Sequence, residues 1–245
     1  IAGVLLSRVA LKAINVIIIL IAVRALTVED YGVYGVFVTT AGLVAVLVSF
    51  GLRHSSAFSI AKLEHPAELV SGSVLLLCVP LFFLAGLLTW MWPALSNPGA
   101  GLHIGTVLGG GAFLVFTIHQ GVFLGRGKLP WFNASEVLPK LGLMAALLIY
   151  IGMSWKLDVS TMIWLYGACY LGSTALFIGI NAATLSGRLQ ASVHECSVLL
   201  RRGFSFGFAV FLIMLNSKLS LLQLNLHSSA EQVGHFYSSL QFTEL

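Results

Sequence analysis

Charged and polar side chains inside long apolar segments are the residues of this sequence that could do chemistry. Six of them are cations or an amide: Arg8, Lys12, Asn15, Arg53, Lys140 and Lys218. A charged side chain at the centre of a bilayer costs about 2.5–3.5 kcal/mol on insertion scales, so each should face protein or water. Gathered in one water-filled cavity, the cations would bind an anionic headgroup such as a diphosphate, because lysine and arginine donate charge-assisted hydrogen bonds to phosphate oxygens.

Three of these residues share the first apolar segment. Arg8, Lys12 and Asn15 stand at positions i, i+4 and i+7, a spacing that puts them on one stripe of a helix. Lys12 is too deep in the segment to reach the membrane interface comfortably. Arg8 could extend its charged end to the inner interface of the membrane. We therefore expect Arg8 and Lys12 to face the interior of the protein.

The remaining cations have alternative interpretations. Arg53 follows Gly51 at the inner end of an apolar segment and could lie at the interface, and Lys218 could reach the outer interface. Lys140 stands four residues after Glu136, the acid that lies clearly inside an apolar segment, in the order that favours a helical ion pair. Glu136 is thus a candidate either for pairing with Lys140 or for coupling transport to an ion.

Several kinds of chemistry have no motif in the sequence. There is no GxxxxGKS or GxxxxGKT motif for a nucleotide and no CxxC pair among the three cysteines. The two aspartates, Asp30 and Asp158, form no DxD metal site, which argues against a metal-dependent glycosyltransferase. We predict no catalytic residue, no metal, no cofactor and no nucleic-acid partner.

The composition predicts the elements that must hold the charged side chains. Hydrophobic residues make up 58% of the 245 residues and charged residues only 9%, against about 25% charge in a soluble domain. Seven apolar segments are close to or above the roughly 20 residues that a helix needs to cross a bilayer. They are 3–25, 33–60, 71–92, 102–124, 131–153, 161–184 and 204–226. The sequence therefore predicts an all-α polytopic membrane protein.

The distribution of lysine and arginine predicts the orientation. With a cytoplasmic N-terminus, six basic residues fall on the inner side: Lys62, Arg126, Lys128, Arg188, Arg201 and Arg202. Two fall on the outer side, Arg24 and Lys156. Because cytoplasmic loops carry an excess of basic residues, we expect a multi-pass protein with its N-terminus in the cytoplasm.

Two short acidic segments indicate an internal repeat. LTVEDYGVYG and SSAEQVGHFY each follow an apolar segment, and they align Glu29 with Glu231 and Gly32 with Gly234. The two copies are 202 residues, or six helices, apart, and an even number of helices keeps both in one membrane orientation. The alternative is a chance similarity between short loops.

The repeat sets the predicted domain boundaries. A first six-helix transmembrane lobe covers 1–186, a cytoplasmic linker covers 187–203, and the truncated start of a second lobe covers 204–245. An eighth helix should begin near Gln232, and under this interpretation at least about four more helices follow residue 245.

Three stretches of the sequence resemble a known family. They are RALTVEDYGVYGVFVTTAGLVAVLVSFGLRHS, LGRGKLPWFNASEVLPKLGLMAALLIY and LLRRGFSFGFAVFLIMLNSKLSLLQLNLHSSAEQVGHFYSSLQFTEL. They resemble the first hairpin, the connection between the fourth and fifth helices, and the entry to the second lobe of O-antigen (Wzx-like) polysaccharide flippases. That family belongs to the two-lobed multidrug/oligosaccharidyl-lipid/polysaccharide exporter superfamily.

The resemblance implies a transporter rather than an enzyme. It implies translocation of a polyprenyl-diphosphate-linked oligosaccharide across the bacterial inner membrane by alternating access, in contact with membrane lipids. Polysaccharide polymerases and glycosyltransferases are the implied protein partners. One alternative is a cation-coupled multidrug (MATE-like) or lipid II-type exporter of the same superfamily, of which the cation-coupled kind would need acids in its spans. The alternative from another class is a membrane-embedded polysaccharide polymerase or acyltransferase, which usually has a large loop or a polar catalytic cluster.

Overall fold

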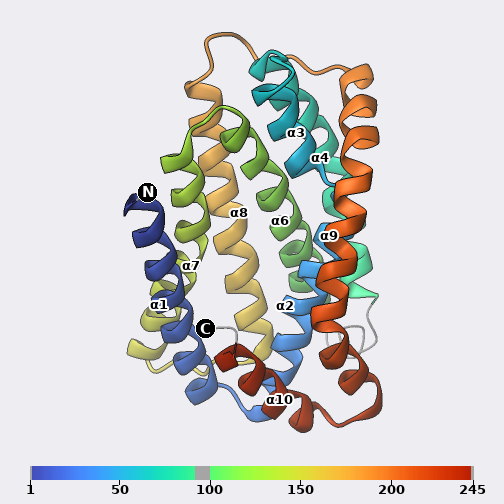
Figure 1. Cartoon of the computed structure of the whole chain (residues 1–245). Helices are drawn as coiled ribbons and strands as arrows, with labels where there is room; N and C mark the ends of the chain where they lie inside the picture. The colour runs from blue at the N-terminus through green and yellow to red at the C-terminus, as the bar shows by residue number, and fades with distance from the viewer. Residues whose placement is uncertain (1, 92–99, 244–245) are drawn as a thin grey trace.

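The chain folds as a bundle of α-helices (Figure 1). The computed structural model describes residues 2–91 and 100–243. Within these ranges there are nine helices and no strand, so the predicted all-α class is confirmed. The helices are α1 (Ala2–Ala25), α2 (Val28–Val48), α3 (Leu52–Ala61), α4 (Ala67–Trp90), α6 (Ala100–Gly125), α7 (Leu129–Gly152), α8 (Val159–Ala183), α9 (Val193–His227) and α10 (Ala230–Thr243).

Six of the described helices are long and apolar enough to cross a membrane: α2, α4, α6 from Ile104 onward, α7, α8 and α9. They overlap the last six of the seven predicted spans, which confirms a polytopic membrane protein. α1 overlaps the first predicted span but carries Arg8, Lys12 and Arg24 along its length.

The predicted span 33–60 is not one helix. A turn separates α2 from α3, and in it Phe50 and Gly51 have positive φ angles of 45° and 68°. A Cβ atom at Gly51 would also collide with the backbone of Gly203 in α9. The left-handed conformation and the close approach both favour glycine, and hydropathy does not register either of them. As a result Arg53 stands in the first turn of a new helix.

The seventh helix begins earlier than predicted. α9 starts at Val193, so most of the predicted linker 187–203 is helical. Its 35 residues extend about 52 Å at 1.5 Å per residue, beyond the roughly 30 Å of hydrocarbon in a bilayer. Long-range contacts stabilise its polar first turns: the buried Glu195 carboxylate lies 3.0 Å from Nδ1 of His65, in the α3–α4 connection.

α6 lies inside the bundle and packs against α8, α4, α3 and α2. Its glycines permit the close approach: a Cβ atom at Gly121 would collide with the Arg53 carbonyl of α3, and one at Gly109 would lie 2.6 Å from the Phe37 ring of α2. α1 packs mainly against α7 and has little contact with α2, its neighbour along the chain. Figure 1 shows α1 at one edge of the bundle and α9 at the opposite edge.

Helix boundaries repeat at the predicted offset. α1 ends at Ala25 and α9 at His227, while α2 begins at Val28 and α10 at Ala230, so both pairs are 202 residues apart. The caps repeat as well. The Thr27 hydroxyl accepts a hydrogen bond from the amide three residues later at 3.1 Å, and the Ser229 hydroxyl does the same at 3.4 Å. These matched elements support the internal repeat, and the division into lobes stays a prediction.

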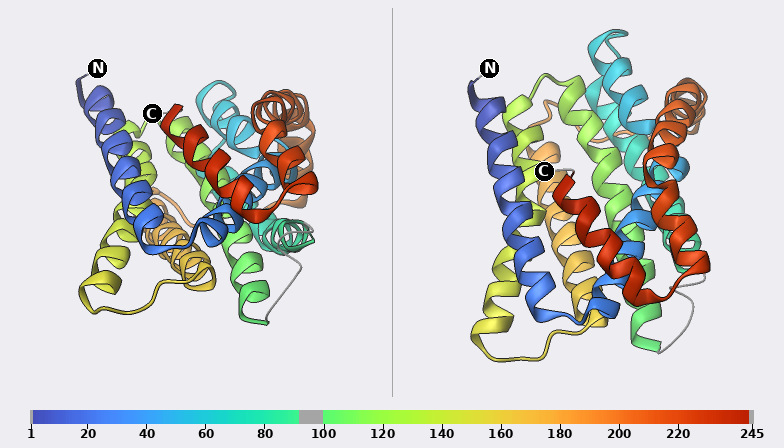
Figure 2. Two further views of the ribbon diagram at one scale, coloured as in Figure 1. Left: turned by 90° about the horizontal axis from the view of Figure 1, so that it is seen from below. Right: turned by 60° about the horizontal axis from the view of Figure 1, so that its bottom comes forward.

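The two repeated segments also touch each other (Figure 2). A Cβ atom at Gly32 would collide with the Ala230 carbonyl, and one at Gly234 would collide with the Val28 carbonyl. The two contacts are reciprocal, since exchanging the copies turns one into the other. The start of α2 and the start of α10 are therefore related by an approximate local two-fold axis that passes through the glycine pair.

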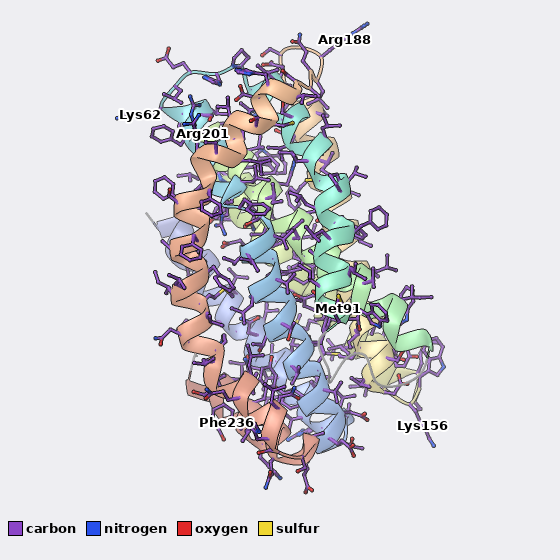
Figure 3. The ribbon with its side chains drawn as sticks, turned by 90° about the vertical axis from the view of Figure 1, so that its right-hand side faces the viewer. Lys62, Met91, Lys156, Arg188, Arg201 and Phe236 are labelled. Carbon is purple, nitrogen blue, oxygen red and sulfur yellow. The ribbon has the colours of Figure 1, made fainter. Side chains whose placement is uncertain are left out.

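The loops at the two ends of the bundle differ in charge. Figure 3 shows Lys62 and Arg188 at one end and Lys156 at the other. Arg126, after α6, belongs to the first end, because its guanidinium donates hydrogen bonds to the carbonyl and hydroxyl of Thr184 at the end of α8. The predicted charge asymmetry is therefore present in the fold. That the more basic end is cytoplasmic stays a prediction.

Candidate functional site: a cationic cavity

A cavity of about 570 Å³ lies among the helices. Residues of α1, α2, α3, α6, α7, α8, α9 and α10 line it. Five of the six predicted headgroup residues, together with the predicted acid, are among them: Arg8, Asn15, Arg53, Lys140, Lys218 and Glu136. The fold thus brings together side chains that are up to 210 residues apart in the sequence, from Arg8 to Lys218.

Lys12 is the predicted residue that does not line the cavity. Its side chain is exposed, whereas Leu11, on the other side of the α1 stripe, is buried and lines the cavity with Arg8 and Asn15. Positions 8, 11, 15, 18, 19 and 22 of α1 line the cavity, and position 12 is not among them. The spacing found the correct stripe but could not say which edge of it faces inward, because packing against α7 decides that.

Glu136 joins three helices through its carboxylate. Oε2 lies 2.9 Å from Nη1 of Arg8 in α1, and Oε1 lies 3.9 Å from Nη2 of Arg53 in α3. Lys140, the partner predicted from the helical spacing, interacts electrostatically with Glu136 but forms no ion pair with it within the described chain. The long arginine side chains reach across from neighbouring helices and take the position in place of Lys140.

Arg53 is held in place but incompletely hydrogen-bonded. Its guanidinium carbon lies 5.3 Å from the centre of the Phe132 ring, within the range of a cation–π interaction. Its Nε is buried and has no hydrogen-bond partner in the part of the chain that the structure describes. The 3.9 Å contact with Glu136 is also longer than a hydrogen bond. Because the Arg53 side chain is 29% exposed, its guanidinium retains donors that an oxyanion in the cavity could use.

Aromatic side chains gather at the end of the cavity beside α10. Five of the six tyrosines of the sequence line the cavity: Tyr31, Tyr34, Tyr166, Tyr170 and Tyr237. The Tyr166 and Tyr170 rings are 4.4 Å apart between centroids, and Tyr31 and Tyr237 are 5.3 Å apart. This group was not predicted from the sequence. The sequence does carry a signal for it. Tyr31 and Tyr34 in α2 are three residues apart, and Tyr166 and Tyr170 in α8 are four apart, so each pair lies on one face of its helix.

The cavity therefore has two chemically different ends. The end lined by Arg8, Arg53 and Glu136 presents cationic donors, and the other presents aromatic rings with hydroxyl groups. Apolar side chains such as Leu143 and Phe116 also line the cavity. In the described ranges no group of three or more His, Cys, Asp and Glu side chains is placed to hold a metal ion. The arrangement is suited to binding an anion with a polar, ring-shaped substituent.

Comparison with known proteins gives one weak relative. The chain is 23% identical over 228 residues to a protein of Escherichia coli (strain K12) named "Putative O-antigen transporter". The alignment covers 87% of this chain and 52% of that protein, so the chain spans about half the length of the curated relative that it matches. No family model matches the sequence, and no solved structure matches.

Proposed function

We propose that this chain is part of a polysaccharide transporter that moves a polyprenyl-diphosphate-linked oligosaccharide across the bacterial inner membrane by alternating access. The similarity to an O-antigen transporter and the membrane-spanning helices support a polysaccharide transporter. The observation that carries the finer proposal is the lining of the cavity, in which the described residues include four cations, Arg8, Arg53, Lys140 and Lys218, and one acid, Glu136.

The charges fit a diphosphate. The described residues that line the cavity include four cations and one carboxylate, so their formal charges sum to +3. A diphosphate diester carries two negative charges. Arg8 of α1 and Arg53 of α3 both contact the Glu136 carboxylate. The same two guanidinium groups could bind a phosphate between them. Each charge-assisted hydrogen bond contributes about 1.5–3 kcal/mol. The lipid tail needs no site, because it can remain in the bilayer.

The aromatic end fits the sugar. A sugar ring offers C–H groups to an aromatic face and hydroxyl groups to hydrogen-bond partners, and a tyrosine supplies both. Tyr166 and Tyr170 lie on α8 and Tyr31 on α2, all facing the cavity. With the headgroup at Arg53, the glycan would extend toward these rings.

The topology completes the proposal. The basic end of the bundle, with Lys62 and Arg188, would face the cytoplasm, and the N-terminus would be cytoplasmic. The charged end of the cavity would then be the inner one, where the lipid-linked substrate is made. Residues 1–186 would form the first lobe, 187–203 the region that joins the lobes, and 204–245 the start of the second.

The proposal can be tested by binding. The purified chain in detergent is titrated with undecaprenyl-diphosphate-linked N-acetylglucosamine, and affinity is measured by microscale thermophoresis. Arg53→Gln should weaken binding about tenfold or more, because it removes about 1.5–3 kcal/mol of charge-assisted contact. Lys12→Gln is the matched control, since it removes the same charge from α1 outside the cavity lining. Equal losses in both variants, or no binding by the unaltered chain, would contradict the proposal.

A further inference from the structure

The carboxylate of Glu136 stands where a phosphate would be bound. Its two oxygens are divided between two guanidinium groups, with Oε2 at 2.9 Å from Arg8 and Oε1 at 3.9 Å from Arg53. Two non-bridging oxygens of a phosphate would make the same pair of contacts, since carboxylate and phosphate are both recognised by arginine through paired oxygens. An anion of the protein therefore occupies the anion site.

This carboxylate is not held firmly. Although Oε2 of Glu136 is buried, it has no partner with hydrogen-bond geometry in the described chain. The neighbouring Nε of Arg53 is buried and without a partner in the same ranges. The Arg8 side chain is 55% exposed, so its end of the ion pair is not enclosed by the described part of the protein. The contacts are ionic and incompletely hydrogen-bonded, which makes them weaker than a bidentate arginine–carboxylate pair.

A second cationic partner for the Glu136 carboxylate lies one turn along the same helix. Lys140 follows Glu136 by four residues, lines the same cavity and forms no ion pair with it in the described structure. Residues at this spacing are neighbours on a helix surface. A change of the Glu136 rotamer would therefore carry the carboxylate from the arginine pair to Lys140 without movement of the backbone.

We propose that Glu136 is an internal competitor for the anion site, which a headgroup must displace toward Lys140, and that the cost of this displacement keeps the phosphodiesters of ordinary phospholipids out of the site. The inference rests on the proposed function. A phosphodiester with one negative charge replaces the single charge that it displaces, so it gains little. A diphosphate carries two negative charges, one more than the carboxylate that it displaces, so it gains an additional attraction to the cations of the cavity. The cavity would thereby stay free of the anionic lipids that surround it in the membrane.

The test compares two probes on the same protein. The full chain in detergent is titrated with dioleoylphosphatidylglycerol, which carries one negative charge, and with undecaprenyl-diphosphate-linked N-acetylglucosamine, which carries two. Glu136→Gln removes the competitor and keeps the size of the side chain. It should raise the affinity for phosphatidylglycerol about tenfold, equivalent to about 1.4 kcal/mol, because this probe no longer has to displace a carboxylate of equal charge. Glu231→Gln, an exposed acid of α10, should change neither affinity.

The outcomes separate this inference from the proposed function. If the unaltered chain binds neither probe, the proposed function fails. If it binds the diphosphate, and Glu136→Gln binds phosphatidylglycerol no better than before, the competitor role is overturned while the proposed function stands. Should Glu136→Gln fail to fold, as judged by thermal unfolding, Glu136→Asp replaces it. Its carboxylate is one methylene further from Arg8, and a rise in phosphatidylglycerol affinity supports the role whereas no rise overturns it.

Discussion

Replacing Gly32 with alanine tests the contact between the two repeated segments. A Cβ atom at this position would lie 2.9 Å from the backbone nitrogen of Gly234 and 3.2 Å from its Cα, and closer still to the Ala230 carbonyl oxygen. All three are backbone atoms, so no side-chain rotation can relieve the collision. Overpacking of this kind typically costs about 1–3 kcal/mol, which exceeds the gain of up to about 1 kcal/mol from placing alanine instead of glycine in a helix.

The matched control is Gly179→Ala in α8, because a Cβ atom there meets nothing within 4 Å. It should leave the thermal unfolding temperature of the detergent-solubilised chain unchanged or raise it, while Gly32→Ala should lower it. Hydrogen exchange of the α10 amides should also become faster in Gly32→Ala, since α10 is the element that the new methyl group pushes away. Gly234→Ala should behave like Gly32→Ala, because its Cβ atom would collide with the Val28 carbonyl.

The double variant sharpens the comparison. If α2 and α10 are pushed apart by either methyl group, the second substitution costs less than the first, so the two effects should be less than additive. Unfolding of Gly32→Ala at the temperature of the Gly179→Ala control, with unchanged exchange in α10, would refute the close contact. The reciprocal geometry at the start of these helices would then have no consequence for stability.

Three further predictions concern the ends of the bundle. Cysteines introduced at 125–128 should react with a membrane-impermeant thiol reagent only from the cytoplasmic side, and those introduced at 153–158 only from outside; the reverse pattern would overturn the orientation. Arg126→Ala should lower stability by about 1–3 kcal/mol in thermal unfolding, because it removes the hydrogen bonds that the guanidinium donates to the end of α8. Hydrogen bonding with Thr161, first through its side chain, lowers the pKa of Asp158 at the start of α8. The stabilisation of the folded chain by the Asp158 carboxylate is thus fully present above the unfolded pKa of about 3.9. It is lost as pH falls through the lower folded pKa. Asp158→Ala should therefore lower the free energy of unfolding by about 1 kcal/mol at neutral pH and by much less in strong acid.

The fold was largely predictable because its main signals are local. Long apolar segments and the turns between them gave the all-α membrane class, and the E-x-x-G pattern around Gly32 and Gly234 gave an offset that the helix boundaries reproduce. The break at Gly51 was not predictable from hydropathy, since it depends on a left-handed backbone and on the approach of α9. The early start of α9 was hidden for a related reason. Its polar first turns are stabilised by the contact between the side chains of Glu195 and His65, which are 130 residues apart in the sequence.

The residue types that line the cavity were predictable from the sequence, whereas their geometry was predictable only in part. Intramembrane charge pointed to Arg8, Arg53, Lys140 and Lys218, and each lines the cavity. Spacing along one helix could not choose between Lys12 and Leu11 for the inner face. It also suggested Lys140 as the partner of Glu136, although side chains of other helices supply the contacts. Partner choice across helices depends on tertiary packing, which a one-dimensional pattern does not contain.

The internal repeat distinguishes residues that the fold needs from residues that it does not. At an offset of 202, the capping hydroxyls of Thr27 and Ser229 correspond, and so do Gly32 and Gly234. The cavity charges follow no such rule, because Arg8 corresponds to Val210 and Lys218 corresponds to Val16.

At each of these positions one copy of the helix forms with a valine, so the charge is not required to build the helix. An arginine or lysine is more costly than valine inside a membrane, so its presence at only one of two equivalent positions needs a cause other than building the helix, such as the ion pair of Arg8 with Glu136. The anionic substrate that we propose for the cavity would be a cause common to both residues, since both line it. The departure of Arg8 and Lys218 from the repeat is thus consistent with the binding role that we propose for them.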